Sequence, residues 1–296
     1  MTPIYNQLLI PFLTAMVVAI TMGGSGTAPA FSASYGANVI RKSIIPGLFG
    51  IMVFVGAFIA GKKTAGTMGS GILPSEFMDF TVVSIALFSI AVTMLISNIS
   101  GIPQSTSQAA VLALAAPALY FGRLDTHNLF VEIIPAWFIL PIISYFLSFF
   151  AGKYIYQPMR RRGLTIQRAQ NENKRHIWDI VLVIMALYVS FAIGSNNVAN
   201  AAGPLYTMTI NELHIRESDH IVILMLATLV VAPCFGIGAS LFGHKILKNT
   251  GKEIILFGKF EAVIIAFISG SLLLLASVVK GIPTSLVQVN VAAILG

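Results

Sequence analysis

The sequence predicts an all-α polytopic membrane protein. Of its 296 residues, 56% are hydrophobic and only 10% are charged, against about 25% charged residues in an ordinary soluble domain. The mean hydropathy is +0.87, and a soluble fold of this length could not bury so much apolar surface. Long uncharged stretches alternate with short polar segments, as in proteins whose helices each cross a bilayer. These observations exclude a soluble enzyme, a nucleic-acid-binding module and a disordered chain.

Nine apolar segments are candidate membrane helices, since a span needs about 20 mostly apolar residues. The first, 8–31, follows an N-terminus without a basic region or cleavage site, so we expect it to be retained. Residues 80–122 are too long for one helix, and Gly101-Ile-Pro103 divides them into two. The glycine-rich stretch 66–71 predicts a flexible external loop. The segments are 8–31, 43–61, the two parts of 80–122, 133–152, 180–211, 221–243, 262–279 and 281–296.

A basic segment separates the first five spans from the rest. Residues 153–175 hold seven Lys and Arg side chains and one acid, Glu172. Basic loops usually lie in the cytoplasm, and with the N-terminus outside, cytoplasmic loops hold 13 of the 18 basic residues. We therefore expect a cytoplasmic linker, 153–176, between two halves, 1–152 and 177–296. Because five spans precede the linker, the second half would be inverted. The net charge of +7 then reflects orientation and not nucleic-acid binding.

Two small polar motifs recur in the same order in both halves. Gly23-Gly-Ser-Gly-Thr-Ala-Pro-Ala30 matches Gly194-Ser-Asn-Asn-Val-Ala-Asn-Ala201, at an offset of 171. Gly101-Ile-Pro-Gln-Ser-Thr-Ser-Gln108 matches Gly281-Ile-Pro-Thr-Ser-Leu-Val-Gln288, at an offset of 180. Inverted repeats with helices interrupted by Gly and Pro are typical of secondary transporters, whose substrate lies between the repeats. We expect an inverted-repeat secondary transporter with broken helices at 23–30 and 194–204 and helical hairpins at the other two motifs.

The interrupted helices predict a binding site for an anion. Half-helix N-termini carry unpaired N–H groups and a partial positive charge, which favour an anion. A hydroxyl that follows the hairpin proline can either cap the helix or bind a ligand, and the sequence leaves both open. The substrate-binding candidates come from the four motifs: Ser25, Gly26, Ser105, Thr106, Ser107, Asn196, Asn197, Asn200, Thr284 and Ser285.

A further group of residues is expected to couple transport to an ion gradient. Glu261 precedes 18 uncharged residues, and an ionisable group inside a membrane segment is a functional candidate. Glu261 could also be an interfacial charge at a helix end, as Glu132 and Asp179 are expected to be. The alternative role of the glutamine amides is to form hydrogen bonds between helices. The spans contain no Ser/His, Cys/His or metal-ligand set, so we expect no enzyme, cofactor or metal. The coupling candidates are Gln104, Gln108, Gln288 and Glu261.

These motifs resemble those of the inorganic phosphate transporter (PiT) family. The motif at 194–201 is similar to its signature G-A-N-D-V-A-N-A, and Pro-x-Ser-Thr-Ser at 103–107 is similar to its second conserved element. More narrowly, Gly-x-Ser-Gly at 23–26 and Asn-Asn-Val-Ala-Asn-Ala-x-Gly-Pro-Leu at 196–205 resemble the bacterial sulfate permease (CysP-type) branch. The resemblance covers nearly the whole chain. It implies a multi-pass plasma-membrane protein that transports an inorganic oxyanion.

The chain departs from the family signature in its charge. The signature aspartates fall at Gly26 and Asn197, and in sodium-coupled phosphate carriers of the family these aspartates help bind Na⁺. Import of a dianion needs a coupling ion, because the membrane potential opposes the entry of negative charge by about 2.3 kcal/mol per charge per 100 mV. The loss of the aspartates favours protons as that ion. Sulfate has no proton and only accepts hydrogen bonds, so a site of donors suits it. We expect sulfate import by proton symport, with sodium- or proton-coupled phosphate transport as the alternative.

Several properties stay open at this stage. An anion channel is a rival to a carrier, and thiosulfate, molybdate and selenate share the charge and shape of sulfate. The oligomeric state is open, and a homo-oligomer is one of the possibilities. The expected partner is a lipid bilayer, and no binding to nucleic acid is expected. The first half continues past its hairpin to 133–152, whereas the second stops at Gly296. The final span is therefore either naturally absent or missing from a fragment.

Overall fold

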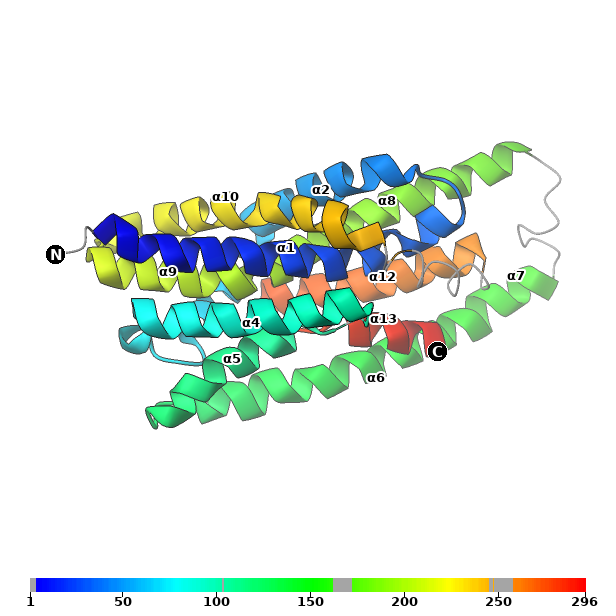
Figure 1. Ribbon diagram of the computed structural model, residues 1–296. Helices are drawn as coiled ribbons and strands as arrows, with labels where there is room; N and C mark the ends of the chain where they lie inside the picture. Colours follow the sequence, from blue (N-terminus) through cyan, green and yellow to red (C-terminus); the bar gives the residue numbers. More distant parts are fainter. Residues whose placement is uncertain (1–3, 103, 162–171, 245–246, 248–257) are drawn as a thin grey trace.

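In the computed structural model the chain forms an elongated bundle of helices (Figure 1). Among the described residues, seven helices are long and apolar enough to cross a membrane, which confirms the predicted fold class. The described residues are 4–102, 104–161, 172–244, 247 and 258–296. The α-helices are α1 (Ile4–Gly36), α2 (Ile45–Ala60), α3 (Lys62–Ser70), α4 (Phe80–Ser100), α5 (Thr106–Tyr120), α6 (Ile134–Ala151), α7 (Gln157–Arg161), α8 (Glu172–Asn197), α9 (Ala199–Leu213), α10 (His220–Gly238), α12 (Lys259–Leu275) and α13 (Leu286–Leu295).

In the part of the chain that the structure describes, four segments with π-helical hydrogen bonding lengthen the membrane helices. They precede and follow α6, and they extend α10 and α12. Insertions of this kind are rare in helices and are frequent at functional sites. The last of them leads directly into the second Gly-Ile-Pro break. The four are η3 (Asn128–Ile133), η4 (Gly152–Tyr156), η7 (Ala239–Gly243) and η9 (Ala276–Lys280).

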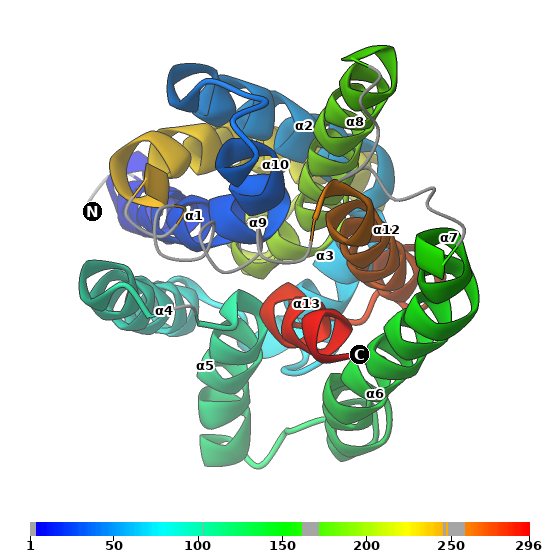
Figure 2. The same ribbon diagram turned by 90° about the vertical axis from the view of Figure 1, so that its right-hand side faces the viewer.

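The two predicted hairpins are present, each with one long and one short arm. Helix α4 contacts α5, and α12 contacts α13. The 15 residues of α5 reach about 22 Å and the 10 residues of α13 about 15 Å, so neither crosses a 30 Å bilayer core alone. The predicted spans over 104–122 and 281–296 are therefore short returning arms. In the end-on view α13 lies near the centre, where it packs on α6 and α12 (Figure 2).

Helices α1 and α8 run in opposite directions through the bundle. In Figure 1, α1 starts at the left end of the molecule and α8 starts at the right. Their neighbours correspond as well: α1 packs on α10 and α4, whereas α8 packs on α2 and α12. This exchange of partners supports the proposed division into inverted halves, 1–152 and 177–296. Most of the proposed linker, at 162–171, lies outside the described residues.

Only one of the two predicted helix breaks is present. The second motif is interrupted at Val198, between α8 and α9. The first motif is not interrupted, since α1 is helical throughout Ile4–Gly36 with Pro29 inside it. The hydroxyl of Thr27 donates to the carbonyl of Gly23 at 2.7 Å, so small polar residues here keep their polar groups bonded within the helix. The prediction of a break at 23–30 is wrong.

The glycine-rich stretch 66–71 is also not the flexible loop that the sequence predicts. Residues 66–70 belong to α3, a short helix that follows α2 after Gly61 and packs against α9, and Gly71 is its C-cap. A Cβ added to Gly69 would collide with the hydroxyl of Thr207 and lie 3.1 Å from the carbonyl oxygen of Gly203. Small residues let two membrane helices approach this closely. Close packing therefore explains the glycine. The start of α3 lies beside the second hairpin, where a Cβ added to Gly281 would meet the backbone of Lys63.

Candidate functional site

Both hairpins turn through the same local structure. Gly101 and Gly281 have φ angles of 71° and 68°, in the left-handed region where a side chain is unfavourable. The N–H groups of the isoleucines that follow them donate back to the preceding helix, from Ile102 to the carbonyl of Ser97 at 3.1 Å and from Ile282 to that of Ala276 at 3.0 Å. The Gly-Ile-Pro sequence thus ends one helix so that another can start a few residues later.

Ser105 and Ser285 are the N-caps of the two short arms. The Ser105 hydroxyl accepts a hydrogen bond from the N–H of Gln108 at 3.3 Å, and the Ser285 hydroxyl accepts one from the N–H of Gln288 at the same distance. Such caps satisfy an otherwise unpaired donor of the first helical turn. Of the two roles that the sequence left open for these hydroxyls, the structure shows capping.

Asn196 joins both hairpins to the end of α8. Its side chain is fully buried, and its Oδ1 accepts from the hydroxyl of Ser107 and from the N–H of Thr284, both at 3.2 Å. Its Nδ2 donates to the hydroxyl of Ser277 at 2.8 Å and to the carbonyl of Ile282 at 3.0 Å. All the hydrogen-bonding capacity of this amide is used by protein groups. Asn196 therefore positions the hairpins and has no group left for a ligand.

Ser107 is held a second time, from the start of α9. The Nδ2 of Asn200 donates to its hydroxyl at 3.2 Å, so Asn196 and Asn200 hold the same hydroxyl from either side of the break at Val198. All three side chains are fully buried. A charge-free network of this kind fixes its members in place when it is satisfied. The break therefore anchors the first hairpin at the first turn of α5.

Three atoms around this network are buried without a hydrogen-bond partner in the part of the chain that the structure describes. They are Oδ1 of Asn197, Oδ1 of Asn200 and the hydroxyl of Thr284. Leaving such a group unpaired costs about 1–3 kcal/mol, and a bound ligand could supply the missing partner. The Asn197 side chain is only 4% exposed. We define Asn197, Asn200, Thr284 and the adjacent, buried Thr106 as the candidate site.

The predicted glutamines lie at the edge of this site. Gln108 donates through Nε2 to Oε1 of Gln288 at 3.2 Å, so residues at equivalent positions of the two motifs meet. Gln104 and Gln108 line a groove of about 410 Å³ between α4 and α5, together with Thr93. The glutamine pair bridges the first turns of the two short arms. This contact is independent of the Asn196 network and joins the hairpins a second time.

Ser25 contacts the long arm of the first hairpin, near the end of α4. Its hydroxyl donates to Oδ1 of Asn98 at 2.7 Å, and Nδ2 of Asn98 donates to the carbonyl of Thr21 at 2.7 Å. This bond joins α1 to the end of α4, as the bond from Asn196 to Ser277 joins α8 to η9. Neither Asn98 nor Ser277 was predicted from the sequence. A polar residue just before each Gly-Ile-Pro break was the available signal.

We expect the Ser25–Asn98 bond to be measurable by a double-mutant cycle. Ser25→Ala and Asn98→Ala should each lower the free energy of unfolding by about 1–2 kcal/mol, and the double variant should lose about 1 kcal/mol less than their sum. Thermal unfolding of the detergent-solubilised protein measures this. As a control, Ser89→Ala removes an exposed hydroxyl that donates only to Ile85 within α4, and it should change little. Strictly additive losses would show that the bond does not stabilise the fold.

Gly26 and Glu261 lie away from the network. A Cβ added to Gly26 would lie 3.2 Å from the ring of Phe49 and 3.6 Å from Ile193, so this position faces α2 and α8. Glu261 is in the first turn of α12, and about 24 Å of helix separates it from Ser277. Lys259, two residues before Glu261 in the chain, pairs with Asp179. The structure therefore does not bring Glu261 to the candidate site.

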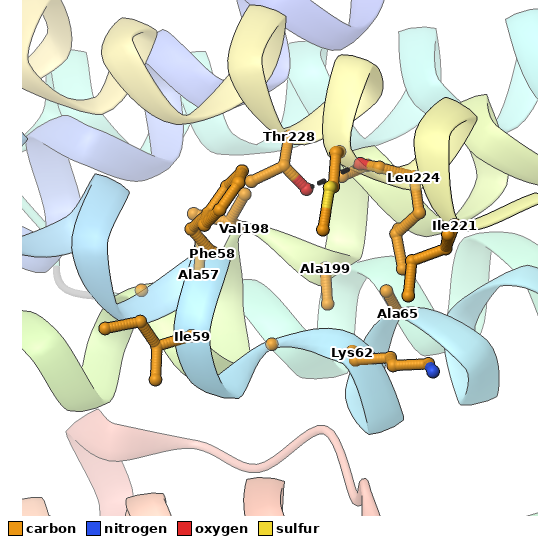
Figure 3. A pocket seen from close by; sticks show the side chains of 14 residues that line it. Ala57, Phe58, Ile59, Lys62, Ala65, Val198, Ala199, Ile221, Leu224 and Thr228 are labelled. Atoms are coloured by element: carbon orange, nitrogen blue, oxygen red, sulfur yellow. Dashed lines mark hydrogen bonds between the residues drawn. The ribbon is translucent and has the colours of Figure 1, made fainter.

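The opposite side of the helix break faces an apolar pocket (Figure 3). Its volume is about 110 Å³, and it lies where Val198 and Ala199 meet α2, α3 and α10. The one hydroxyl among its walls, that of Thr228, donates to the carbonyl of Leu224 at 2.8 Å. Lys62 lines the pocket from the start of α3. Its hydroxyl is already bonded and Lys62 is its one charged lining residue, so the pocket offers no cluster of donors to an anion.

Known proteins with a similar sequence or fold match this chain over nearly its whole length. The chain is 29% identical over 289 residues to the sulfate permease CysP of Bacillus subtilis (strain 168), covering 97% of this chain and 76% of that protein. A solved structure of "The sodium-dependent phosphate transporter" matches with a TM-score of 0.82 and 20% identity, covering 97% of this chain and 88% of that one. At that identity the match shows the fold alone. The sequence profile described as "Phosphate transporter family" matches residues 22–296, so the family expected from the motifs is confirmed: this chain belongs to the phosphate transporter family, as a multi-pass membrane transporter and not an enzyme.

Proposed function

We propose that this transporter imports inorganic sulfate across the plasma membrane by proton symport. The observation that carries the proposal is Asn197, a buried neutral amide with an unpartnered atom. It stands where the family signature has an aspartate, and Gly26 stands at the corresponding place in the first half. In the described residues, the hydrogen bonds around Asn196, Ser107 and Thr284 come from amides, hydroxyls and backbone groups, and none comes from a carboxylate.

A site without negative charge favours sulfate for a chemical reason. Sulfate is fully deprotonated near neutral pH and can only accept hydrogen bonds, so it needs donors such as hydroxyls, amide NH₂ groups and backbone N–H groups. The Thr284 hydroxyl is an unpartnered donor, and a half-turn of the Asn197 amide would present its NH₂ group. The short arms α5 and α13 add the partial positive charge of helix N-termini. The sulfate permease named above is consistent with this choice.

Phosphate is the second candidate, and a specific feature favours it. The unpartnered atoms of Asn197 and Asn200 are both amide oxygens, which accept hydrogen bonds. Phosphate carries one or two protons near neutral pH and could donate to them, whereas sulfate could not. The solved relative is named a sodium-dependent phosphate transporter. The alternative is therefore phosphate transport coupled to sodium or to protons.

Uptake in proteoliposomes tests substrate and coupling together. The purified protein would be reconstituted, and the uptake of radiolabelled sulfate and phosphate would be followed under an imposed pH gradient or Na⁺ gradient. We expect sulfate to accumulate when the outside is acidic, with little effect of Na⁺. Accumulation of phosphate alone, or a strict need for Na⁺, would favour the alternative. The coupling roles of Gln104, Gln108, Gln288 and Glu261 stay predictions.

Asn197→Asp is expected to weaken sulfate uptake about tenfold or more. A carboxylate in the candidate site would repel a dianion and would remove the NH₂ donor. Phosphate uptake should fall less, because its protons can be donated to the new carboxylate. Initial rates over a range of each substrate concentration measure the change. A sulfate affinity that is unchanged or stronger in the variant would exclude a site selected for donors.

A further inference from the structure

We propose that Lys62, Lys63 and Lys280 form a cationic mouth that attracts the oxyanion toward the second hairpin. The inference rests on the proposed function, since it assumes an anionic substrate, and it names residues outside the four motifs. Two of the lysines begin α3, and the third ends η9 just before Gly281. All three side chains are exposed. We call these three residues the lysine mouth.

Helix α3 and the second hairpin are in direct contact. Nζ of Lys63 donates to the carbonyl of Val279 at 3.1 Å. A Cβ added to Gly281 would lie 2.8 Å from the backbone of Lys63, so the backbones themselves touch. The ammonium group of Lys63 therefore lies at the carbonyl of the residue that precedes Lys280. Both lysines border Gly281–Ser285, the segment that supplies Thr284 to the candidate site.

The lysine mouth keeps a net positive charge. Nζ of Lys280 lies 3.2 Å from Oε1 of Glu132 and 3.3 Å from Oε2, and their side chains are 60% and 34% exposed. Within the described residues, Lys62 and Lys63 have no acidic side chain within 4.0 Å. Among the described residues, Glu132 is therefore the one carboxylate paired with any of the three lysines. An exposed pair of this kind is weak, so an incoming dianion can compete with Glu132 for Lys280.

The three lysines lie at the depth of the helix break. One candidate span runs over Lys42–Ala60 and another over Lys259–Lys280, and both begin on the side expected to be cytoplasmic. Lys62 follows the first span and lines the same pocket as Val198, whereas α9 continues past the break to Leu213. Ionisable residues at such a depth are costly away from water and point to an ion path. Because α12 runs about 32 Å from Lys259 to Lys280 and α13 turns back, the tip of the second hairpin, and the mouth with it, would point away from the cytoplasmic side.

The first hairpin has no lysine at the position equivalent to Lys280. Ser100 stands at the position equivalent to Lys280, at the motif offset of 180. A feature needed only to end a helix before Gly-Ile-Pro would be expected at both breaks, whereas the positive charge is found at one. Clustered charges of one sign raise the local concentration of an oppositely charged ligand and speed its capture. The asymmetry therefore assigns capture to the side from which an imported anion arrives.

The test measures uptake of radiolabelled sulfate, and of phosphate in parallel, into cells of a strain that lacks its own uptake system. For Lys63→Gln and Lys280→Gln we expect the half-saturating concentration at low ionic strength to rise about 3- to 10-fold, and the difference to shrink when salt shortens the screening length. Lys280→Arg keeps the charge and should remain near wild type. The matched control is Arg216→Gln, since Arg216 is also a cation near an acid, Asp219, but lies in the exposed segment between α9 and α10.

Glu132→Gln gives an effect that misfolding cannot imitate. Removing this carboxylate frees Lys280, so the half-saturating concentration should fall about twofold at low ionic strength. The inference is overturned if Lys63→Gln and Lys280→Gln keep the wild-type value at every ionic strength, or if Lys280→Arg fails as Lys280→Gln does. It is also overturned, together with the proposed function, if the wild-type chain takes up neither anion. Wild-type uptake with unaltered variants rejects the lysine mouth alone.

Discussion

Replacement of Asn196 by alanine should reduce transport to the background rate. The change removes four buried hydrogen bonds. It leaves the N–H of Thr284 and the carbonyl of Ile282 without these partners, whereas the hydroxyl of Ser107 keeps Asn200 and that of Ser277 keeps the carbonyl of Leu273. Each unpaired buried group costs about 1–3 kcal/mol, and the two hairpins lose their common anchor. We expect initial uptake rates to fall at least about 100-fold, with a lower midpoint of thermal unfolding. Uptake in proteoliposomes and unfolding in detergent measure the two effects separately.

The matched control for this prediction is Asn211→Ala. Asn211 also donates through Nδ2 to backbone carbonyls, including that of Met78 at 3.1 Å, but at the far end of α9. Its loss should lower stability modestly and leave the uptake rate within about twofold of wild type. If Asn196→Ala transports as fast as Asn211→Ala does, the network around Asn196 is dispensable and the hairpins are positioned by other contacts.

The hairpins could be predicted from the sequence because their structure is local. Gly-Ile-Pro ends a helix through a left-handed glycine, and the serine two residues after the proline caps the next helix. The same sequence motif therefore forms the same N-cap hydrogen bond at Ser105 and at Ser285. The offset of 180 also related Gln108 to Gln288, which bond to each other. The equivalence of their positions in the two repeats thus pointed to a contact between Gln108 and Gln288, although they are 180 residues apart in the chain.

Other features depend on distant partners and could not be predicted in this way. The motif at 23–30 looks like its counterpart at 194–201, yet α1 passes through it unbroken while α8 ends. The partner of Ser25 is Asn98, and its place just before a Gly-Ile-Pro break marks it as a candidate but does not say which residue it bonds. Likewise, Lys259 pairs with Asp179, which is 80 residues away in the chain. In each case a residue from another helix decides the outcome, and a single sequence does not contain that pairing.

Gly56→Ala should prevent the bundle from assembling. A Cβ at Gly56 would collide with the carbonyl oxygen of Phe191 in α8, and a Cβ at Gly194 in α8 would collide with that of Val53 in α2. The obstacles are backbone atoms, so no side chain can move aside, and the two helices would have to separate along their shared contact. Overpacking of this kind costs about 1–3 kcal/mol or more. We expect little or no monodisperse protein by size-exclusion chromatography in detergent.

Gly47→Ala is the control because it makes the same chemical change in the same helix. A Cβ at Gly47 meets nothing within 4 Å, and alanine favours a helix over glycine by about 1 kcal/mol, so this variant should be as stable as wild type or slightly more so. Comparable behaviour of Gly47→Ala and Gly56→Ala would show that the contact between α2 and α8 tolerates a methyl group. The proximity of Gly194 to Asn196 and Asn197 makes the consequence functional: the packing that requires glycine also fixes where α8 ends, and the end of α8 carries the amides of the candidate site.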